Sequence, residues 1–222
     1  MFGWIARSAL PTPGFVDWLF DRTRTLLGMK DWPCALVPHE DAPTTKELLG
    51  AGVPYAGERS GGAAGTFSMT ADGPRITWSP EIVRDPEGFI ATMAHELSHY
   101  ILQGVESEPP GGAEAEEPAT DVCAVLLGFG VFLANNAFTF EQHQDGVMQG
   151  WSAVRRGYLD EMQLAHALAI HLELNGTPES VARPWLRDNP PADLKHALRD
   201  VRKHRVEDMR MLRALRGPVA AP

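Results

Sequence analysis

Two histidines and a glutamate lie together in one short segment, Ala94-His95-Glu96-Leu97-Ser98-His99. Residues four apart on a helix project from the same face, about one turn apart. His95 and His99 can therefore offer two imidazole nitrogens to one zinc ion, and Glu96 lies at the edge of that face, where it can hydrogen-bond a metal-bound water. The segment predicts a hydrolytic zinc site; the alternative is two surface histidines beside a solvated glutamate.

A catalytic zinc site usually has three protein ligands and one position for water. Glu117 and Asp121 supply two carboxylates, four residues apart, at the entrance to a very apolar segment. Glu114 and Glu116 belong to the same acidic run, but only Glu117 has an aspartate four residues later. Asp121 itself and His143 are the other candidates for the third ligand.

Together these motifs resemble the gluzincin metallopeptidases, the thermolysin-like group of zincins, in which the HExxH helix is followed about twenty residues later by a Glu-x-x-x-Asp helix. The resemblance implies that His95 and His99 bind zinc and that Glu96 is the general base. It further implies that Glu117 is the third ligand and that Asp121 holds a zinc-bound histidine, fixing the tautomer of the ring.

The resemblance covers roughly residues 75–135 and extends to a neighbouring strand. Zincins place an edge strand beside the metal helix to align an extended substrate, and the resemblance assigns this role to Arg75–Ser79. Pro118 departs from the family pattern, because a proline disfavours helical geometry in the residue before it. Glu117 is therefore expected at the boundary of its helix.

The activity that the resemblance implies is peptide-bond hydrolysis, with a peptide or protein as substrate. Zinc would activate a water, and Glu96 would take its proton and deliver it to the leaving amine. The residues between Arg84 and Arg155 include no Lys or Arg. The donor to the oxyanion is therefore sought among Tyr100, His143, Tyr158 and Arg155.

A second hypothesis is a zincin-fold binding or regulatory protein with a structural zinc. A fourth protein ligand or a blocked cleft would favour it, whereas the presence of Glu96 argues for an enzyme. A latent enzyme that opens on binding a partner would have the same sequence features.

Charge and composition exclude several other classes of protein. The chain has 222 residues, of which 44% are hydrophobic, and a formal net charge of −9. Such a charge disfavours nucleic acid and anionic membranes as partners. The longest apolar run, Val122–Ala134, has 13 residues, fewer than the roughly 20 that cross a bilayer. No membrane partner is expected.

The two cysteines, Cys34 and Cys123, are expected to be buried reduced thiols, so the chain is placed by default in the cytoplasm.

The order of predicted elements gives an α+β fold, a zincin-like domain with a small mixed or antiparallel sheet and a pair of metal-binding helices. We expect two domains, a zincin-like domain at residues 1–145 and a helical subdomain packed on it at residues 146–222. The elements expected are a helix from Pro13 to Gly28, a strand at Cys34–Val37, a hairpin of Thr66–Thr70 with Arg75–Ser79, helices at 86–104, about 120–134 and 158–174, and a helical stripe over 194–215.

Overall fold

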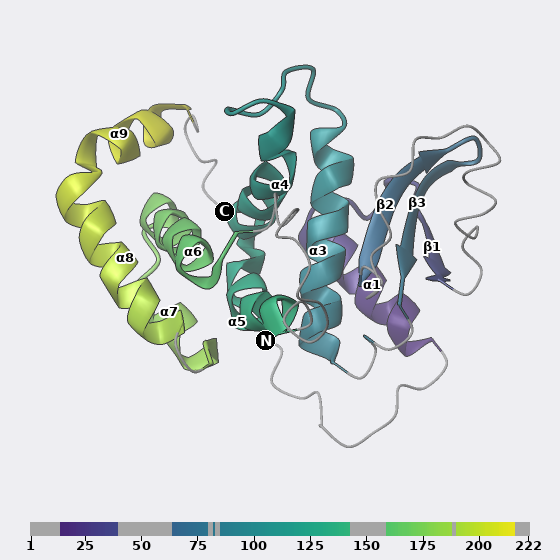
Figure 1. The fold of residues 1–222 in the computed structure, drawn as a ribbon, viewed down its shortest axis with the longest axis horizontal. Helices are drawn as coiled ribbons and strands as arrows, with labels where there is room; N and C mark the ends of the chain where they lie inside the picture. The colour runs from purple at the N-terminus through teal and green to yellow at the C-terminus, as the bar shows by residue number, and fades with distance from the viewer. Residues whose placement is uncertain are drawn as a thin grey trace, which may run out of the picture. The chain divides into compact units, whose positions relative to one another are not determined.

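The computed structural model describes residues 14–39, 64–79, 82, 85–142, 159–187 and 190–215, which are drawn in colour in Figure 1. The chain divides into two compact units, Met1–Glu106 and Ser107–Pro222. In the described residues, the first unit holds a small sheet and the helices α1 and α3, and the second is helical. The α+β class is therefore confirmed. The predicted domain boundary at 145 lies outside the described residues, and that division stays a prediction.

The sheet consists of β1 (Ala35–Pro38), β2 (Gly65–Thr70) and β3 (Gly73–Trp78). Strand β2 pairs antiparallel with β3, which places Phe67 opposite Ile76, and β1 pairs parallel with β3. The hairpin turn contains Gly73 with a φ of 117°, a conformation that favours glycine. Both the predicted hairpin and the predicted mixed sheet are confirmed.

The assignment of Arg75–Ser79 as an edge strand is wrong. The strand order is β1-β3-β2, so β3 lies in the centre of the sheet. Its parallel partner β1 comes from a distant part of the chain, and the hydrophobic pattern of a strand does not show which strand will pair with it. Of the described strands, β2 has the most extensive contact with the helix that carries the histidines.

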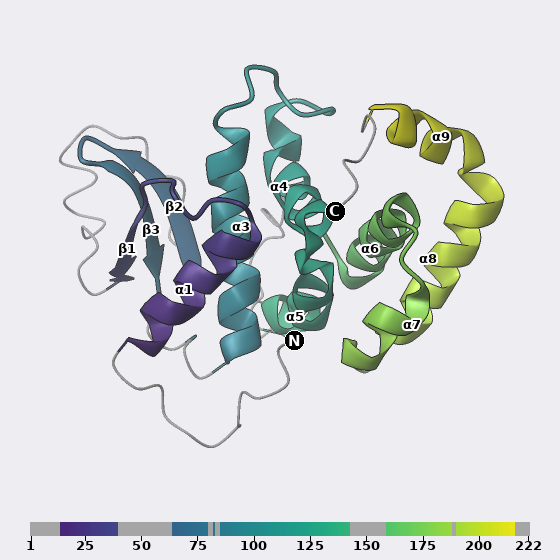
Figure 2. The ribbon, with the colours of Figure 1, turned by 180° about the vertical axis from the view of Figure 1, so that it is seen from behind.

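Helix α3 (Pro86–Leu102) begins with Asp85 and Pro86, as predicted from the helix-start signals of these residues. Every residue from Gly88 to Ser98 is buried. Its Phe89 ring meets Trp78 of β3 edge-on, 5.9 Å away, and Ile76 of the same strand is fully buried. Helix α1 (Phe15–Leu26) packs against α3 and ends before Gly28, as predicted (Figures 1 and 2). The predicted start of this helix at Pro13 lies outside the described residues.

Strand β2 approaches α3 closely because residue 65 has no side chain. A Cβ atom on Gly65 would lie 2.6 Å from Cγ2 of Thr92 and 3.2 Å from Cγ of Glu96. The first of these distances is shorter than van der Waals contact allows. Glycine at position 65 therefore sets the distance between the strand and the helix that carries Glu96.

Substitution of Gly65 by alanine is expected to lower the free energy of unfolding by about 1–3 kcal/mol, the usual cost of overpacking. The double variant Gly65→Ala/Thr92→Ser removes the Cγ2 atom in the way and should recover most of this loss. Gly104→Ala is the control, since its Cβ would meet nothing closer than 3.4 Å. Urea denaturation followed by circular dichroism measures all three variants, and equal stability of Gly65→Ala and Gly104→Ala would contradict the close contact.

In the second unit, helix α4 (Glu116–Ala124) starts about four residues earlier than predicted. It follows a single 3-10 turn, η3 (Ala113–Ala115). Pro118 lies in the first turn of α4, where the backbone N–H that proline lacks would have no partner within the helix. Glu117 is consequently helical, contrary to the expectation from Pro118, although it does lie at the helix boundary.

The apolar helix that was predicted to run from about Thr120 to Ala134 is interrupted. A π-helical segment, η4 (Val125–Phe129), joins α4 to α5 (Gly130–Gln142), and Gly128 within it has a φ of 102°. His171 Nδ1 lies 3.1 Å from the carbonyl oxygen of Leu126 in this segment. Mid-helix departures of this kind leave backbone carbonyls without an intrahelical partner, and His171 is placed to satisfy one of them.

The whole helical run Ala113–Ala137 is longer than its 13-residue apolar core. By length and composition alone it could cross a membrane, with a mean hydropathy of 1.5 over its most apolar window. In the structure 44% of that window is buried. Val125 and Phe129 are among the buried residues, while Leu126 is 43% exposed. The predicted core helix is thus buried on one side only.

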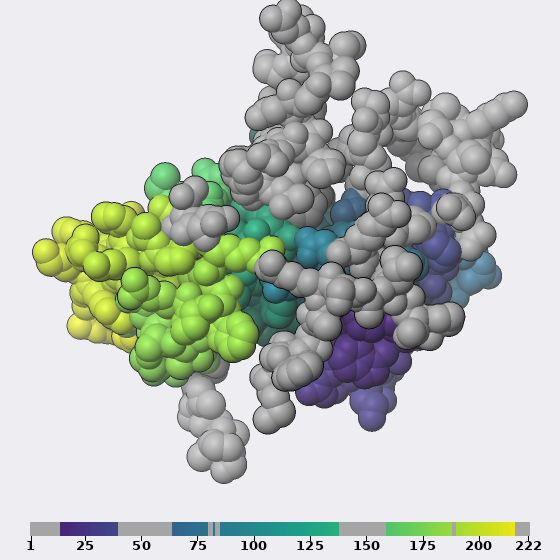
Figure 3. Space-filling view, turned by 90° about the horizontal axis from the view of Figure 1, so that it is seen from below, coloured from purple at the N-terminus to yellow at the C-terminus, as the bar shows by residue number. Residues whose placement is uncertain are grey.

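The remaining helices are α6 (Glu161–Asn175), α7 (Glu179–Ala182), α8 (Pro190–His204) and α9 (Val206–Leu215). A capping box formed by Asp160 and Gln163 starts α6, and Gly176 ends it with a φ of 62°. The C-terminal stripe predicted as one segment is two helices, α8 and α9 (Figure 1), and the atoms of this part of the chain are yellow-green to yellow in Figure 3. Leu194, Leu198 and Val201 are buried, whereas Leu215 is exposed.

Candidate metal centre

The two histidines of α3 have ring nitrogens close enough together to bind one metal ion. Nε2 of His95 is 3.2 Å from Nε2 of His99, and the rings are inclined at 81°. Two tetrahedral zinc ligands, each 2.0–2.1 Å from the ion, are separated by about 3.3 Å. A direct hydrogen bond between the rings would use one Nε2 as donor, whereas a metal ion would accept electron pairs from both. His95 is buried, and His99 is partly exposed.

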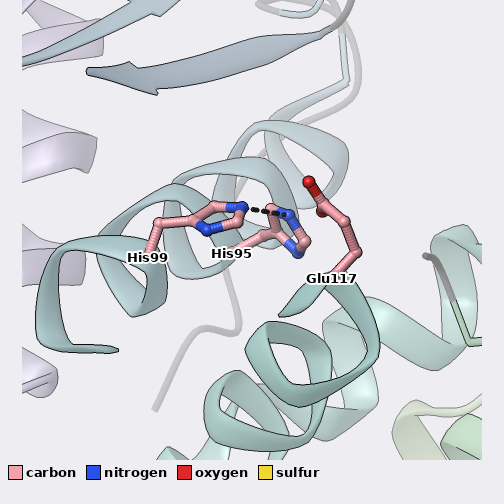
Figure 4. Close-up of side chains that lie close together, drawn as sticks. All are labelled: His95, His99 and Glu117. Atoms are coloured by element: carbon pink, nitrogen blue, oxygen red, sulfur yellow. Dashed lines mark hydrogen bonds between the residues drawn. The ribbon is translucent and has the colours of Figure 1, made fainter. Parts of the chain in front are cut away.

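Glu117 belongs to the same group. Ligand atoms of His95, His99 and Glu117 all lie within 4.8 Å of one another, and Figure 4 shows the three side chains. Glu114 and Glu116, the rivals in the acidic run, are exposed and lie outside this group. The three residues are a group that could hold a metal ion, and two imidazoles with one carboxylate are a ligand set that suits zinc.

Glu96 is buried, with 5% of its surface exposed. Its Oε2 accepts a hydrogen bond of 2.7 Å from the backbone N–H of Phe67 in β2. A hydrogen bond donated to a carboxylate stabilises its charged form, which is the form a general base needs. Sequence reasoning missed this partner, because it is a backbone group of a strand 29 residues earlier in the chain. The signals that a strand lay nearby were the predicted hairpin and the edge strand that the zincin resemblance implies, and neither indicated Phe67.

One turn before Glu96, the hydroxyl of Thr92 is buried and has no hydrogen-bond partner in the described part of the structure. Such a group is uncommon, because burial of a hydroxyl without a partner costs free energy. Thr92 and Glu96 both border Gly65. An unused polar group therefore lies close to the predicted base.

Asp121 lies on α4, one turn after Glu117, and is buried. Its Oδ2 accepts a hydrogen bond of 2.9 Å from the backbone N–H of Leu159. This bond ties α4 to the residues that precede α6. The hydrogen bond that Asp121 would accept from a zinc-bound histidine stays a prediction.

Of the four candidates for the oxyanion donor, only Tyr100 lies among the described residues. It follows His99 on α3, and its ring stacks on Phe67, with the centroids 5.3 Å apart. Trp32 meets the same ring edge-on at 4.9 Å. His143, Arg155 and Tyr158 lie outside the described ranges.

The cysteines do not contribute to the group. Burial raises the pKa of the Cys34 thiol to about 11, with a smaller opposing effect from the positive charge of Arg24. Cys34 is therefore a protonated thiol at neutral pH, and a thiolate is the form that binds metals. Neither Cys34 nor Cys123 is in a disulfide, and both are partly buried, less buried than expected.

Comparison with known proteins identifies no relative. The chain matches no protein-family model, no curated protein and no solved structure. The resemblance to zincins therefore rests on the motifs, the fold class and the geometry of the three side chains.

Proposed function

We propose that the chain is a zinc-dependent peptidase in which His95, His99 and Glu117 bind the ion and Glu96 is the general base. The observation that carries the proposal is the 3.2 Å separation of the two Nε2 atoms on a buried helix, with a buried glutamate between the two histidines in sequence. A structural zinc site has no use for a base at that position. The acidic ligand supplies one negative charge, as in other His₂Glu catalytic sites.

Glu96 would act in two steps. Zinc, when bound, supplies an activated water and polarises the carbonyl of the substrate. The hydrogen bond from Phe67 N–H to Oε2 orients the carboxylate of Glu96, to which we assign the proton transfer. The carboxylate takes a proton from the attacking water and passes it to the leaving amine as the C–N bond breaks.

Strand β2 is our candidate for aligning the substrate, in place of β3. Because Phe67 N–H is directed at Glu96, the backbone groups of alternate residues of β2 face away from β3. An extended peptide can add to such an edge through main-chain hydrogen bonds. This supports a peptide or protein as substrate.

The third ligand is tested with a matched pair of variants. Glu117→Gln should weaken zinc binding by about 100-fold or more, beyond the 10–100-fold that loss of an outer-shell partner causes. Glu116→Gln removes a neighbouring exposed charge from the same helix and should leave the affinity within about two-fold. Competition against a chromophoric chelator measures both. Equal affinities of the two variants would remove Glu117 from the site.

The same preparations separate the enzyme from a protein with a structural zinc. We expect the zinc-loaded chain to cleave a denatured protein substrate and the chelated chain to leave it intact. A chain that binds zinc tightly at this site but cleaves neither denatured protein nor short peptides would instead be the non-catalytic form.

A further inference from the structure

Strand β2 runs alongside α3 in the same direction. Gly65 borders Thr92 and Glu96, and two residues later Phe67 stacks on Tyr100. Two residues of a strand advance by about 6.8 Å, and the four residues from Glu96 to Tyr100 advance by about 6 Å. The two elements therefore stay in register. Met69, the next residue on the same face of β2, is 59% exposed.

Trp32 adds a third aromatic ring to the contact between Phe67 and Tyr100. Phe67 lies 20° from parallel with Tyr100, and Trp32 meets Tyr100 at 76°. Trp32 is 40% exposed, so the ring cluster reaches solvent. The backbone of Trp32 is held in place, because its carbonyl accepts a hydrogen bond of 3.0 Å from Arg24 and its N–H donates to the carbonyl of Met29.

The cluster lies next to the predicted chemistry. Tyr100 directly follows His99, and Phe67 is the residue whose N–H holds Glu96. One helical turn, about 6 Å, corresponds to two residues of an extended peptide. A peptide bound with its reacting bond at Glu96 would therefore bring a side chain within two residues of that bond to the rings.

We infer that Trp32, Phe67 and Tyr100 form a subsite for a large apolar side chain of the substrate, most favourably an aromatic one. The inference rests on the proposed peptidase function for its position relative to the reacting bond. Ring stacking and burial of apolar surface supply the binding energy. The three rings themselves carry no charge, so a charged side chain of the substrate that stacked on them would lose solvation.

The experiment compares Trp32→Ala with Trp18→Ala in the full chain. Trp18 is also an exposed tryptophan of the same unit, but it stacks on Phe15 and not on the cluster. Cleavage sites in a denatured protein, mapped by mass spectrometry, should show Phe, Tyr, Trp or Leu within two residues of the cleaved bond. Two synthetic peptides, identical except for Phe or Ala at that position, are then used with each variant.

For the Phe peptide, Trp32→Ala should raise KM by about 3- to 10-fold and leave kcat within two-fold, the loss expected from one ring contact. For the Ala peptide the KM should not change. Trp18→Ala should change neither, and Trp32→Phe should restore most of the affinity for the Phe peptide. A lower affinity for both peptides alike would overturn the inference, because a general structural defect acts on both.

Binding gives a second measurement that needs no cleavage. Calorimetry with zinc-loaded Glu96→Gln should show the Phe peptide binding more tightly than the Ala peptide, and Trp32→Ala in that background should abolish the difference. Equal binding of the two peptides overturns the subsite. Cleavage without preference overturns the subsite and leaves the peptidase standing, whereas preferential binding without any cleavage by the wild-type chain supports the subsite and refutes the peptidase.

Discussion

Glu96→Gln should abolish peptide cleavage and keep zinc bound. The substitution removes the proton acceptor, which contributes about 10²- to 10⁴-fold to the rate of such reactions. It preserves the shape of the side chain, and an amide oxygen still accepts the hydrogen bond that Phe67 N–H donates to Oε2. The contact between β2 and α3 should therefore survive. Cleavage rates of a fluorogenic peptide and zinc content by mass spectrometry measure both effects.

Two further variants test whether the loss of cleavage comes from the Glu96 carboxylate itself. Glu106→Gln removes an exposed carboxylate from the same unit and should leave the rate unchanged. Glu96→Ala should lose the rate and also some stability, because it leaves Phe67 N–H without its carboxylate partner. Undiminished cleavage by Glu96→Gln would show that this residue is not the base.

His95→Ala should lose zinc and activity together. Removal of one of two paired imidazoles leaves a single histidine and a carboxylate, one ligand fewer than the three that a catalytic zinc site uses. Metal binding to the native state also adds stability, by about 4 kcal/mol when free zinc exceeds the Kd by 1,000-fold. Zinc should therefore raise the melting temperature of the wild-type chain and leave that of His95→Ala unchanged. Scanning calorimetry with and without zinc measures the difference.

His196→Ala is the control for this series, because His196 is an exposed histidine of α8, distant in sequence from the HExxH segment. Its melting temperature should respond to zinc as that of the wild-type chain does. A response to zinc that persists in His95→Ala would place the ion at other ligands.

Local signals were sufficient for the elements that carry the site. Asp85 and Pro86 marked the start of α3, and the four-residue spacing of His95 and His99 implied a shared face, which the 3.2 Å separation of their Nε2 atoms bears out. The aspartate four residues after Glu117 singled it out from its acidic neighbours, and Glu117 is the one found in the group with the histidines.

Contacts between residues far apart in the chain could not be predicted from the sequence. The pairing of β1 with β3 puts β3 in the centre of the sheet, and nothing in residues 75–79 indicates a partner 40 residues earlier. The Phe67 backbone donor and the close approach at Gly65 are contacts between a strand and a helix, which hydrophobic patterns do not specify. Pro118 was interpreted from its effect on the preceding residue, but the first turn of a helix accommodates it.

A zinc titration of the full chain, combined with X-ray absorption at the zinc edge, would identify the metal ligands themselves. We predict one equivalent of zinc, with two imidazole nitrogens and a carboxylate oxygen at about 2.0–2.2 Å and no sulfur ligand. Glu117→Gln should change the oxygen shell, and Glu116→Gln should not. A chain that takes up no zinc, or one whose zinc is bound by cysteine sulfur, would contradict a zinc site at His95, His99 and Glu117.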